Sequence, residues 1–283
     1  MFNENLLFVF KLLQQYDNIS YPLGVTYMAS QSLQVSEIPT NKDHWKERVE
    51  LAASFRWVEK LNMHEAVGNH LSLAVNEEGT QFLMNPNLVH FSLIKASNLI
   101  LVDANDLNTL NHRNSPDPSA WGLHGSIHRH CPHHRCLMHV HSVYATVLAS
   151  LADSYLPPID QNSAVFFNRT VIDNNYGGLA FKEEGERCSN LLSNPSKKVL
   201  IMGNHGVMVM GDNVADTFNR LYYFERAAMT YIKALQTGKS LRIMSDAVAE
   251  KVAQETENYC GFPQRHLGNL MTILNNEGSD YAS

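Results

Sequence analysis

The sequence has few cysteines, no long apolar run and no excess of positive charge. Its four cysteines, Cys131, Cys136, Cys188 and Cys260, form no C-x-x-C pair, and the N-terminus lacks the basic and then apolar pattern of a secretion signal. No uncharged apolar stretch approaches the roughly 20 residues that a membrane helix needs. These absences argue against a membrane protein and against a disulfide-rich secreted protein, and they favour a cytoplasmic protein.

The charge balance argues against a further class of partner. The chain of 283 residues has a formal net charge of −6 and a sequence pI near 6.1. It therefore has no overall basic field that would attract nucleic acid or an anionic membrane surface. Hydrophobic residues make up 44% of the chain and charged residues 18%, which is typical of a globular protein. This length allows one large domain or two small ones.

Periodicity and turn signals predict a mixed α/β domain over residues 44–240. Residues 1–43 are expected to form an N-terminal helix, at 4–16, followed by an extension. Residues 241–283 are expected to form a helical tail that packs partly on a neighbouring subunit. Within the domain, apolar spacing predicts helices at 40–63, 93–98, 121–130, 142–151 and 213–236, and strands at 70–75, 81–84, 99–102, 136–141, 199–202 and 207–210.

Histidine is the unusually frequent residue. The chain has 14 histidines, and residues 124–141 contain a dense cluster of them. His139 and His141 end a predicted strand, where residues i and i+2 point to the same face and can present both imidazoles to one ion. His205 lies in a Gly-flanked turn between two apolar strands and is a candidate third ligand. Three histidines with an open position suit a divalent metal, with zinc favoured and manganese or iron as alternatives.

The spacing alone leaves a plainer interpretation open. An isolated H-x-H pair serves as readily for hydrogen bonding or as a surface group as it does for metal binding. His130, His133 and His134 lie beside Arg129 and Arg135 and are expected at the surface rather than at a metal.

Two longer stretches carry a resemblance to a known family. LHGSIHRHCPHHRCLMHVHS at 123–142 and VLIMGNHGVMVMGDNVADTFNRLYYFERAA at 199–228 resemble the class II aldolase/adducin family. NHLSLAV at 69–75, FLMNP at 82–86 and KASNLILVD at 95–103 fit its early hairpin and the following strand. The match spans about residues 45–237. The resemblance implies a three-layer α/β/α sandwich with a central, mainly antiparallel sheet, and a homotetramer. It also implies that His139, His141 and His205 hold a catalytic metal.

The sequence departs from the sugar-phosphate aldolases of that family at the acid/base. Their glutamate lies nineteen residues before the first metal histidine, and Ala120 is at that position here. Alanine can neither bind a metal nor transfer a proton. The nearest replacements are His124 and His128, which lie four residues apart and so share a helix face. Either could be the acid/base or could pack in a supporting role.

The phosphate-binding elements also differ. The Gly-Asn-x-Ser turn has an extra His70 between Asn69 and Leu71, and the serine pair before the glutamate is reduced to Ser119. An incomplete set of donors favours a substrate without phosphate, such as a hydroxy-acid, a keto-acid or an aromatic carboxylate. Six residues are candidates for binding the substrate: Asn69, His70, Ser72, Ser119, Gln161 and Tyr223. Arg169 and Lys95 are candidate partners for a substrate carboxylate, and Glu225 is a candidate for orienting a ligand histidine.

Three functions remain open. The first is a metal-dependent lyase that cleaves a C–C bond by aldol cleavage or decarboxylation in a small hydroxy- or keto-carbonyl substrate. The second is a non-haem iron oxidoreductase on the same fold. The third is a non-catalytic, adducin-like interaction module, against which the retention of all three metal histidines argues.

Overall fold

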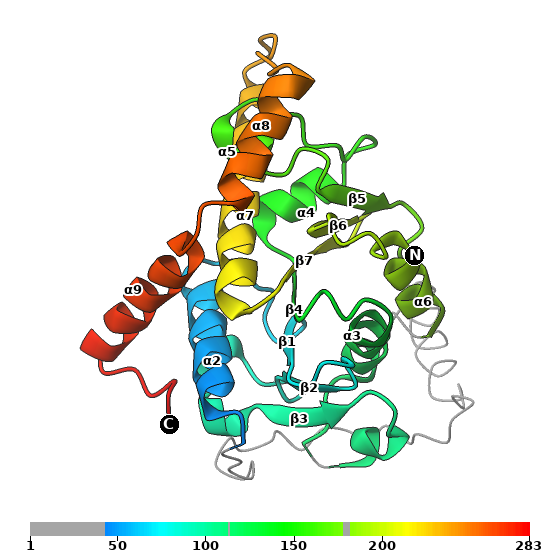
Figure 1. The fold of residues 1–283 in the computed structure, drawn as a ribbon, viewed down its shortest axis with the longest axis vertical. Helices are drawn as coiled ribbons and strands as arrows, with labels where there is room; N and C mark the ends of the chain where they lie inside the picture. Colours follow the sequence, from blue (N-terminus) through cyan, green and yellow to red (C-terminus); the bar gives the residue numbers. More distant parts are fainter. Residues whose placement is uncertain (1–42, 113, 178–181) are drawn as a thin grey trace, which may run out of the picture. The chain divides into compact units, whose positions relative to one another are not determined.

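A seven-stranded sheet forms the centre of the computed structural model, which describes residues 43–112, 114–177 and 182–283 (Figure 1). The helix predicted at 4–16 lies outside the described residues. The strand order is β3-β2-β1-β4-β7-β6-β5, and every neighbouring pair is antiparallel except β5 and β6. The strands are β1 His70–Ala74, β2 Gln81–Met84, β3 Ile100–Asp103, β4 Cys136–Val140, β5 Thr170–Asp173, β6 Val199–Met202 and β7 Gly206–Gly211.

Helices cover both faces of this sheet. They are α2 Trp45–Lys60, α3 Pro118–His130, α4 Val143–Ala149, α5 Gln161–Ala164, α6 Lys182–Leu191, α7 Val214–Gln236, α8 Asp246–Glu257 and α9 Phe262–Asn276, with short 3-10 helices η2 Phe91–Leu93, η3 Ala96–Asn98 and η4 Leu107–Asn111. Figure 1 shows α2 and α7 on one side of the sheet and α3 and α6 on the other. The predicted α/β/α sandwich with a mainly antiparallel sheet is confirmed.

Alternation along the strands explains the two layers. Successive side chains of a strand point to opposite faces, so Met138 and Val140 of β4 join the core that packs against α2, α4, α7 and α9. Leu137 joins the second core, which lies under α3 and α6. His139 therefore points to the α3 side, as do His70 and Ser72 of the neighbouring β1, whose residue His70 is paired with His139.

Local signals explain the two helices that matter most for the site. Asp117 caps α3 by accepting hydrogen bonds from the backbone N–H groups of Ser119 and Ala120, and Pro118 occupies the first turn. Asn213 caps α7 through the N–H of Asp216, and Gly238 follows the helix in the left-handed conformation. The helix predicted at 213–236 is therefore confirmed within one residue.

Several predicted elements differ from the structure. The helix predicted at 40–63 is α2, which begins at Trp45 and ends at Lys60. Residues 93–98 form parts of η2 and η3 instead of one helix, and the strand predicted to end at His141 ends at Val140. The tail after residue 240 is helical. Its Leu267 and Leu274 are buried in the main core of the same chain, where α9 packs against α2 and α7. A contact of the tail with a neighbouring subunit stays a prediction.

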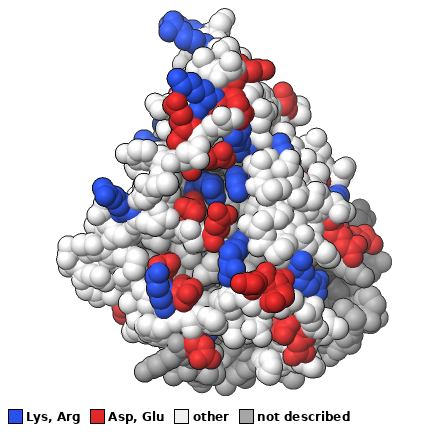
Figure 2. Space-filling view, in the orientation of Figure 1, with Lys and Arg blue, Asp and Glu red and all other residues white. Residues whose placement is uncertain are grey.

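The surface carries both signs of charge. Figure 2 shows lysine and arginine side chains interspersed with aspartate and glutamate side chains on the face it draws. The buried Arg169 forms an ion pair with Glu250 at 2.6 Å. Among the described residues, no helix is both long and apolar enough to cross a membrane.

Candidate metal centre

Three histidine side chains converge where β4 and the β6–β7 turn meet. His139 is the fourth residue of β4, His141 follows the strand, and His205 lies in the turn before β7. The Nε2 atoms are 3.1 Å apart between His139 and His141, 3.1 Å between His141 and His205, and 3.2 Å between His205 and His139. We call these three residues the triad.

The outer ring nitrogens fix the direction in which two of these imidazoles face. The Nδ1–H of His139 donates to the backbone carbonyl of Val207 at 3.0 Å, and Nδ1 of His141 lies 2.5 Å from the Glu65 carboxylate. A neutral imidazole carries one proton. Because that proton is used at Nδ1, both Nε2 atoms present lone pairs to each other.

This arrangement fits a cation. Two lone pairs at 3.1 Å repel each other unless a positive charge lies between them. Three imidazole nitrogens around a tetrahedral zinc ion, with Zn–N bonds of 2.0–2.1 Å, would be about 3.3 Å apart. The separations within the triad are close to that value. The Glu65 carboxylate would add the outer hydrogen bond that metal-bound histidines commonly make.

Gly206 allows the β6–β7 turn to come close to His141 and to the end of β4. A Cβ atom on Gly206 would lie 2.7 Å from Cδ2 of His141 and 2.7 Å from the carbonyl oxygen of Val140. No larger residue fits there without displacing a ligand. Asn204 adopts a left-handed conformation with φ of 58°, which asparagine tolerates better than most residues. The glycines beside His205 thus have the close-approach role that the sequence predicted.

Burial keeps the imidazoles of His139 and His205 neutral, as metal binding requires. Desolvation, followed by the neighbouring His70, lowers the pKa of His139 well below its usual value. Desolvation, followed by His141, lowers the pKa of His205 to about 4. Both groups therefore offer lone pairs at neutral pH.

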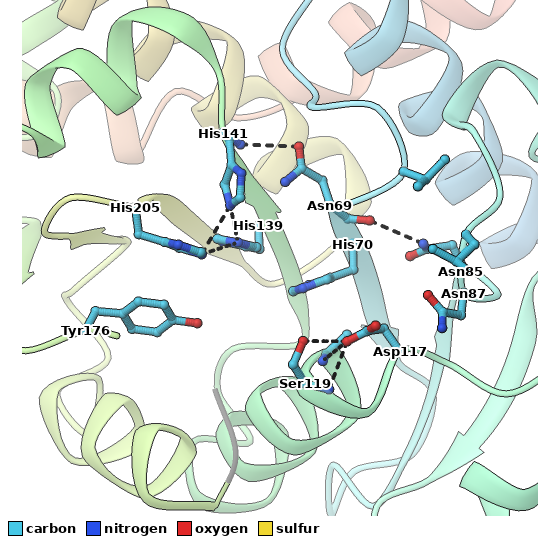
Figure 3. Close-up of a pocket in the computed structure, with 14 residues that line it drawn as sticks. Asn69, His70, Asn85, Asn87, Asp117, Ser119, His139, His141, Tyr176 and His205 are labelled. Carbon is cyan, nitrogen blue, oxygen red and sulfur yellow. Dashed lines mark hydrogen bonds between the residues drawn. The ribbon is translucent and has the colours of Figure 1, made fainter. Parts of the chain in front are cut away.

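The triad opens into a pocket of about 260 Å³ (Figure 3). In Figure 3, His70 extends into it from β1, and Tyr176 extends from the other side with its hydroxyl group toward the interior. The lining residues are Val67, Gly68, Asn69, His70, Asn85, Asn87, Leu88, Asp117, Ser119, Ala120, His139, His141, Tyr176 and His205.

Asn69 presents a fixed hydrogen-bond donor to this pocket. Its side-chain oxygen accepts from the backbone N–H of Glu65 at 2.7 Å and from that of His141 at 3.3 Å. These two contacts identify the oxygen, so the second terminal atom of the side chain is the amide nitrogen, which is a donor. That nitrogen is buried and has no hydrogen-bond partner in the described structure. A buried unpaired donor is costly, and an oxygen of a bound molecule would satisfy it.

The two predicted acid/base histidines do not line the pocket. His124 and His128 do share a face of α3, but that face is fully buried against β1. His124 Nε2 lies 2.7 Å from Nδ1 of His70, and both histidines contact Ser72 Oγ. The side chain at the pocket wall is thus His70. Ser72, predicted to bind substrate, is also fully buried behind it.

Of the other predicted substrate-binding residues, Asn69, His70 and Ser119 line the pocket. Gln161 and Tyr223 do not: Gln161 is the first residue of α5, and Tyr223 packs against the core beside Tyr222.

The predicted charged partners are engaged elsewhere. Arg169 binds the carboxylates of Glu250 and Glu257, and Lys95 binds Asp280 at 2.6 Å. Glu225 orients no ligand histidine. Its carboxylate accepts hydrogen bonds from Ser142 and from the backbone N–H groups of Tyr144 and Ala145, at the start of α4.

One histidine expected at the surface is buried. His134 has no exposed surface, and both of its ring nitrogens lack hydrogen-bond partners in the described structure. Desolvation, followed by His133, lowers its pKa to about 3. The surface prediction for His134 is therefore wrong, because the turn before β4 folds inward. His130 and His133 are not fully buried.

Glu65, Asp117 and Tyr176 are among the residues of the site that were not predicted from the sequence. Asp117 could have been found, because an aspartate followed by proline before an apolar periodic stretch predicts a helix cap. Glu65 and Tyr176 lie in irregular segments, where no periodicity indicates a direction for the side chain.

The same fold occurs in proteins of known structure. A solved structure of an aldolase II superfamily protein from Pseudomonas syringae matches with a TM-score of 0.76 and 27% identity, and the match covers 86% of this chain and 97% of that chain. The family model of the Class II Aldolase and Adducin N-terminal domain matches residues 49–232. The chain belongs to this family.

Two relatives carry more specific names. Decarboxylase NovR of Streptomyces niveus is 26% identical over 201 residues, which cover 70% of this chain and 68% of NovR. A 4-hydroxy-3-prenylphenylpyruvate oxygenase/4-hydroxy-3-prenylbenzoate synthase of Streptomyces roseochromogenus is 26% identical over 194 residues, which cover 68% of this chain and 65% of that protein. The family thus includes proteins that are named as enzymes.

Proposed function

We propose that this protein is a metal-dependent lyase that cleaves a C–C bond, by decarboxylation or aldol cleavage, in a small hydroxy- or keto-carbonyl substrate without phosphate. The observation that carries the proposal is the triad, whose Nε2 atoms lie 3.1–3.2 Å apart at the wall of a pocket. His139, His141 and His205 would hold a divalent ion, with zinc preferred. Such an ion supplies a Lewis acid for the oxygen atoms of the substrate.

The pocket's own side chains support a phosphate-free substrate. Of the described residues that line it, none is lysine or arginine. A phosphate dianion would therefore lack the cationic partner that such groups usually find. The volume of about 260 Å³ also suits a small molecule.

The lining groups are suited to hold and orient substrate oxygens. Asn69 offers its unpaired amide N–H. Burial raises the pKa of the Tyr176 hydroxyl, so that group stays protonated at neutral pH and donates a hydrogen bond. The Ser119 hydroxyl donates to Asp117 and is left with lone pairs for a substrate hydroxyl. Donors and acceptors thus face the triad from three sides.

Ala120, at the position where the family resemblance expects the aldolase glutamate, lines the pocket and offers no acid/base group there. Decarboxylation needs no base to remove a hydroxyl proton, whereas aldol cleavage does. The missing carboxylate therefore favours decarboxylation. The name of the NovR relative agrees with this preference.

The test is turnover of phosphate-free 3-oxo acids and 4-hydroxy-2-oxo acids by zinc-loaded protein, measured as the carbon dioxide released by decarboxylation and as the aldehyde released by aldol cleavage. We expect one of the two products, and a rate at least 100-fold lower in His205→Ala. His133→Ala is the matched control, because His133 contacts the backbone carbonyl of Leu192 and the ring of His134 and does not line the pocket. Absence of turnover by metal-loaded protein, or equal rates in wild type and His205→Ala, would contradict the proposal.

A second candidate is a non-haem iron oxidoreductase. Three neutral histidines with open positions can hold Fe(II), and the relative from Streptomyces roseochromogenus is named an oxygenase. Oxygen consumption that matches substrate loss in the iron-loaded protein would favour this candidate. Product formation at the same rate without oxygen would favour the lyase.

Assembly and location complete the proposal. We expect a homotetramer, as the family resemblance suggests, and a cytoplasmic location. Light scattering of the purified protein tests the tetramer, since a mass equal to one chain would contradict it. A preparation that binds no metal under any condition would favour the adducin-like interaction module.

A further inference from the structure

A chain of hydrogen bonds between buried side chains leads away from the pocket. Nδ1 of His70 lies 2.7 Å from Nε2 of His124, whose Nδ1 lies 2.5 Å from Ser72 Oγ. Ser72 Oγ in turn lies 2.8 Å from Nε2 of His128. We call these four residues the histidine chain. His124, Ser72 and His128 have no exposed surface, and His70 is 8% exposed, at the pocket wall.

Counting protons shows that the chain has two states. Each neutral imidazole carries one proton and the serine hydroxyl carries one, which gives four protons for three hydrogen bonds. If His124 donates to Ser72, then Ser72 donates to His128 and His70 donates to His124. Nε2 of His70 is then bare, and His128 carries its proton on Nδ1. If every bond is reversed, Nε2 of His70 carries a proton and Nδ1 of His128 is bare.

Burial keeps the members of the chain neutral. A charged imidazole inside the protein would lose its hydration, and the hydrogen-bonded partners within the chain are imidazoles and a hydroxyl group, without a carboxylate. Desolvation lowers the pKa of His128 to about 3 and that of His124 well below its usual value. The proton count therefore holds at neutral pH.

We propose that His70 replaces the missing glutamate as the group that exchanges hydrogen bonds with the substrate, and that Ser72 is the positioning residue that couples the proton position on His70 to that on His128. This inference rests on the proposed function, since His70 faces the same pocket as the triad. Ser72 is suited to this role because a hydroxyl group can both accept and donate. It joins His124 to His128, so its two bonds must run in the same direction along the chain.

Removing the hydroxyl group would uncouple the two ends. In Ser72→Ala, Nδ1 of His124 and Nε2 of His128 both lose their partner, and no bond then ties the proton on His70 to the proton on His128. Ser72→Thr keeps the hydroxyl group on a residue that suits a strand. Ser126→Ala is a matched control, because Ser126 is a buried serine on α3 that bonds Ser189 and His130, outside the chain.

The direct readout is the tautomer of each histidine, measured by long-range ¹H–¹⁵N NMR on zinc-loaded protein labelled with ¹⁵N-histidine. In wild type we expect one proton in total on the two end nitrogens, Nε2 of His70 and Nδ1 of His128. In Ser72→Ala we expect this restriction to be lost. Protons on both end nitrogens of the wild-type protein, or on neither, would overturn the inference. So would an unchanged pattern in Ser72→Ala.

The kinetic readout uses the substrate found by the lyase assay. We expect Ser72→Ala to keep its metal and its KM within about threefold, and to lose at least tenfold in kcat, whereas Ser72→Thr recovers most of the rate. Rates in Ser72→Ala equal to those in Ser126→Ala, or a loss as large in Ser72→Thr as in Ser72→Ala, would contradict the positioning role. The NMR test needs no activity, so failure of the proposed lyase reaction leaves it valid.

Discussion

Two groups of histidines lie side by side in this protein and differ in how their protons are used. In the triad, Nδ1 of His139 and of His141 face acceptors on the outside, so the Nε2 lone pairs meet with no proton between them. In the histidine chain, a proton lies on the line between each pair of partners. The first arrangement fits a cation, and the second is complete without one.

The ring contact between the two groups shows how local this difference is. His139 and His70 are paired across β4 and β1, and their ring centroids are 4.8 Å apart. The imidazole of His139 belongs to the triad, and the imidazole of His70 faces His124. The identity of the residues does not decide between metal binding and proton-bonded packing. The atoms around the second nitrogen of each ring decide it.

The largest effect short of removing a ligand is expected for Gly206→Ala. The added Cβ would lie 2.7 Å from His141 Cδ2 and from the Val140 carbonyl, so the ligand or the turn must move. We expect metal affinity to fall by about 100-fold, the upper end of the effects seen for groups that orient ligands. Competition with a chelator measures this affinity. Gly268→Ala is the control, because a Cβ there meets nothing within 4 Å, and equal affinities in the two variants would refute the close-approach argument.

A smaller effect is expected for Glu65→Gln, which removes the carboxylate beside Nδ1 of His141. The amide still accepts a hydrogen bond but no longer favours the proton on Nδ1 by its charge. Metal affinity should fall by roughly 10-fold, within the range for second partners of metal-bound histidines. Glu78→Gln, in the exposed turn between β1 and β2, should leave the affinity unchanged. A loss in both variants would point to surface charge instead of ligand orientation.

The histidine chain should control acid stability without affecting the metal. The folded-state pKa of His128, about 3, lies below the ordinary value near 6.5. The unfolded state therefore binds more protons as pH falls. Its contribution to stability is present above about pH 6.5 and is lost progressively toward pH 3. The free energy of unfolding should fall between pH 6 and pH 4.5 in both proteins. In His128→Gln this fall should be smaller than in wild type by about 2 kcal/mol.

Urea denaturation of metal-free protein at the two pH values measures this difference. The exposed His112→Gln is the control, and its pH dependence should match that of wild type. Metal content should be unchanged in His128→Gln. An identical fall of stability in all three proteins would show that His128 is not kept neutral by the fold.

The smallest effect is expected for Lys95→Met, which touches neither group of histidines. Lys95 is ion-paired with Asp280 near the C-terminus, and both side chains are partly exposed. Pairs of this kind contribute less than about 1 kcal/mol. Thermal unfolding should show a small change, and KM for a carboxylate substrate should not change. A raised KM would restore Lys95 as a substrate-binding residue.

Much of the fold and the triad could be predicted from the sequence, for identifiable reasons. The H-x-H pair, the Asn-His-Gly turn and the apolar strands around them are local patterns. Strand alternation alone predicts that His139 and Val140 point to opposite faces of the sheet. The positions of His124 and His128 could not be predicted as well. Helical spacing placed them on one face, but only the packing of α3 on β1 determines that this face meets Ser72 instead of the pocket.

The central claim is that the triad binds one divalent ion per chain, and elemental analysis of protein purified after incubation with zinc, manganese or iron(II) tests it most directly. We expect about one ion per chain in wild type and in the His133→Ala control, and less than a tenth of that in His141→Ala. A wild-type protein without metal, or equal metal in wild type and His141→Ala, would contradict the account.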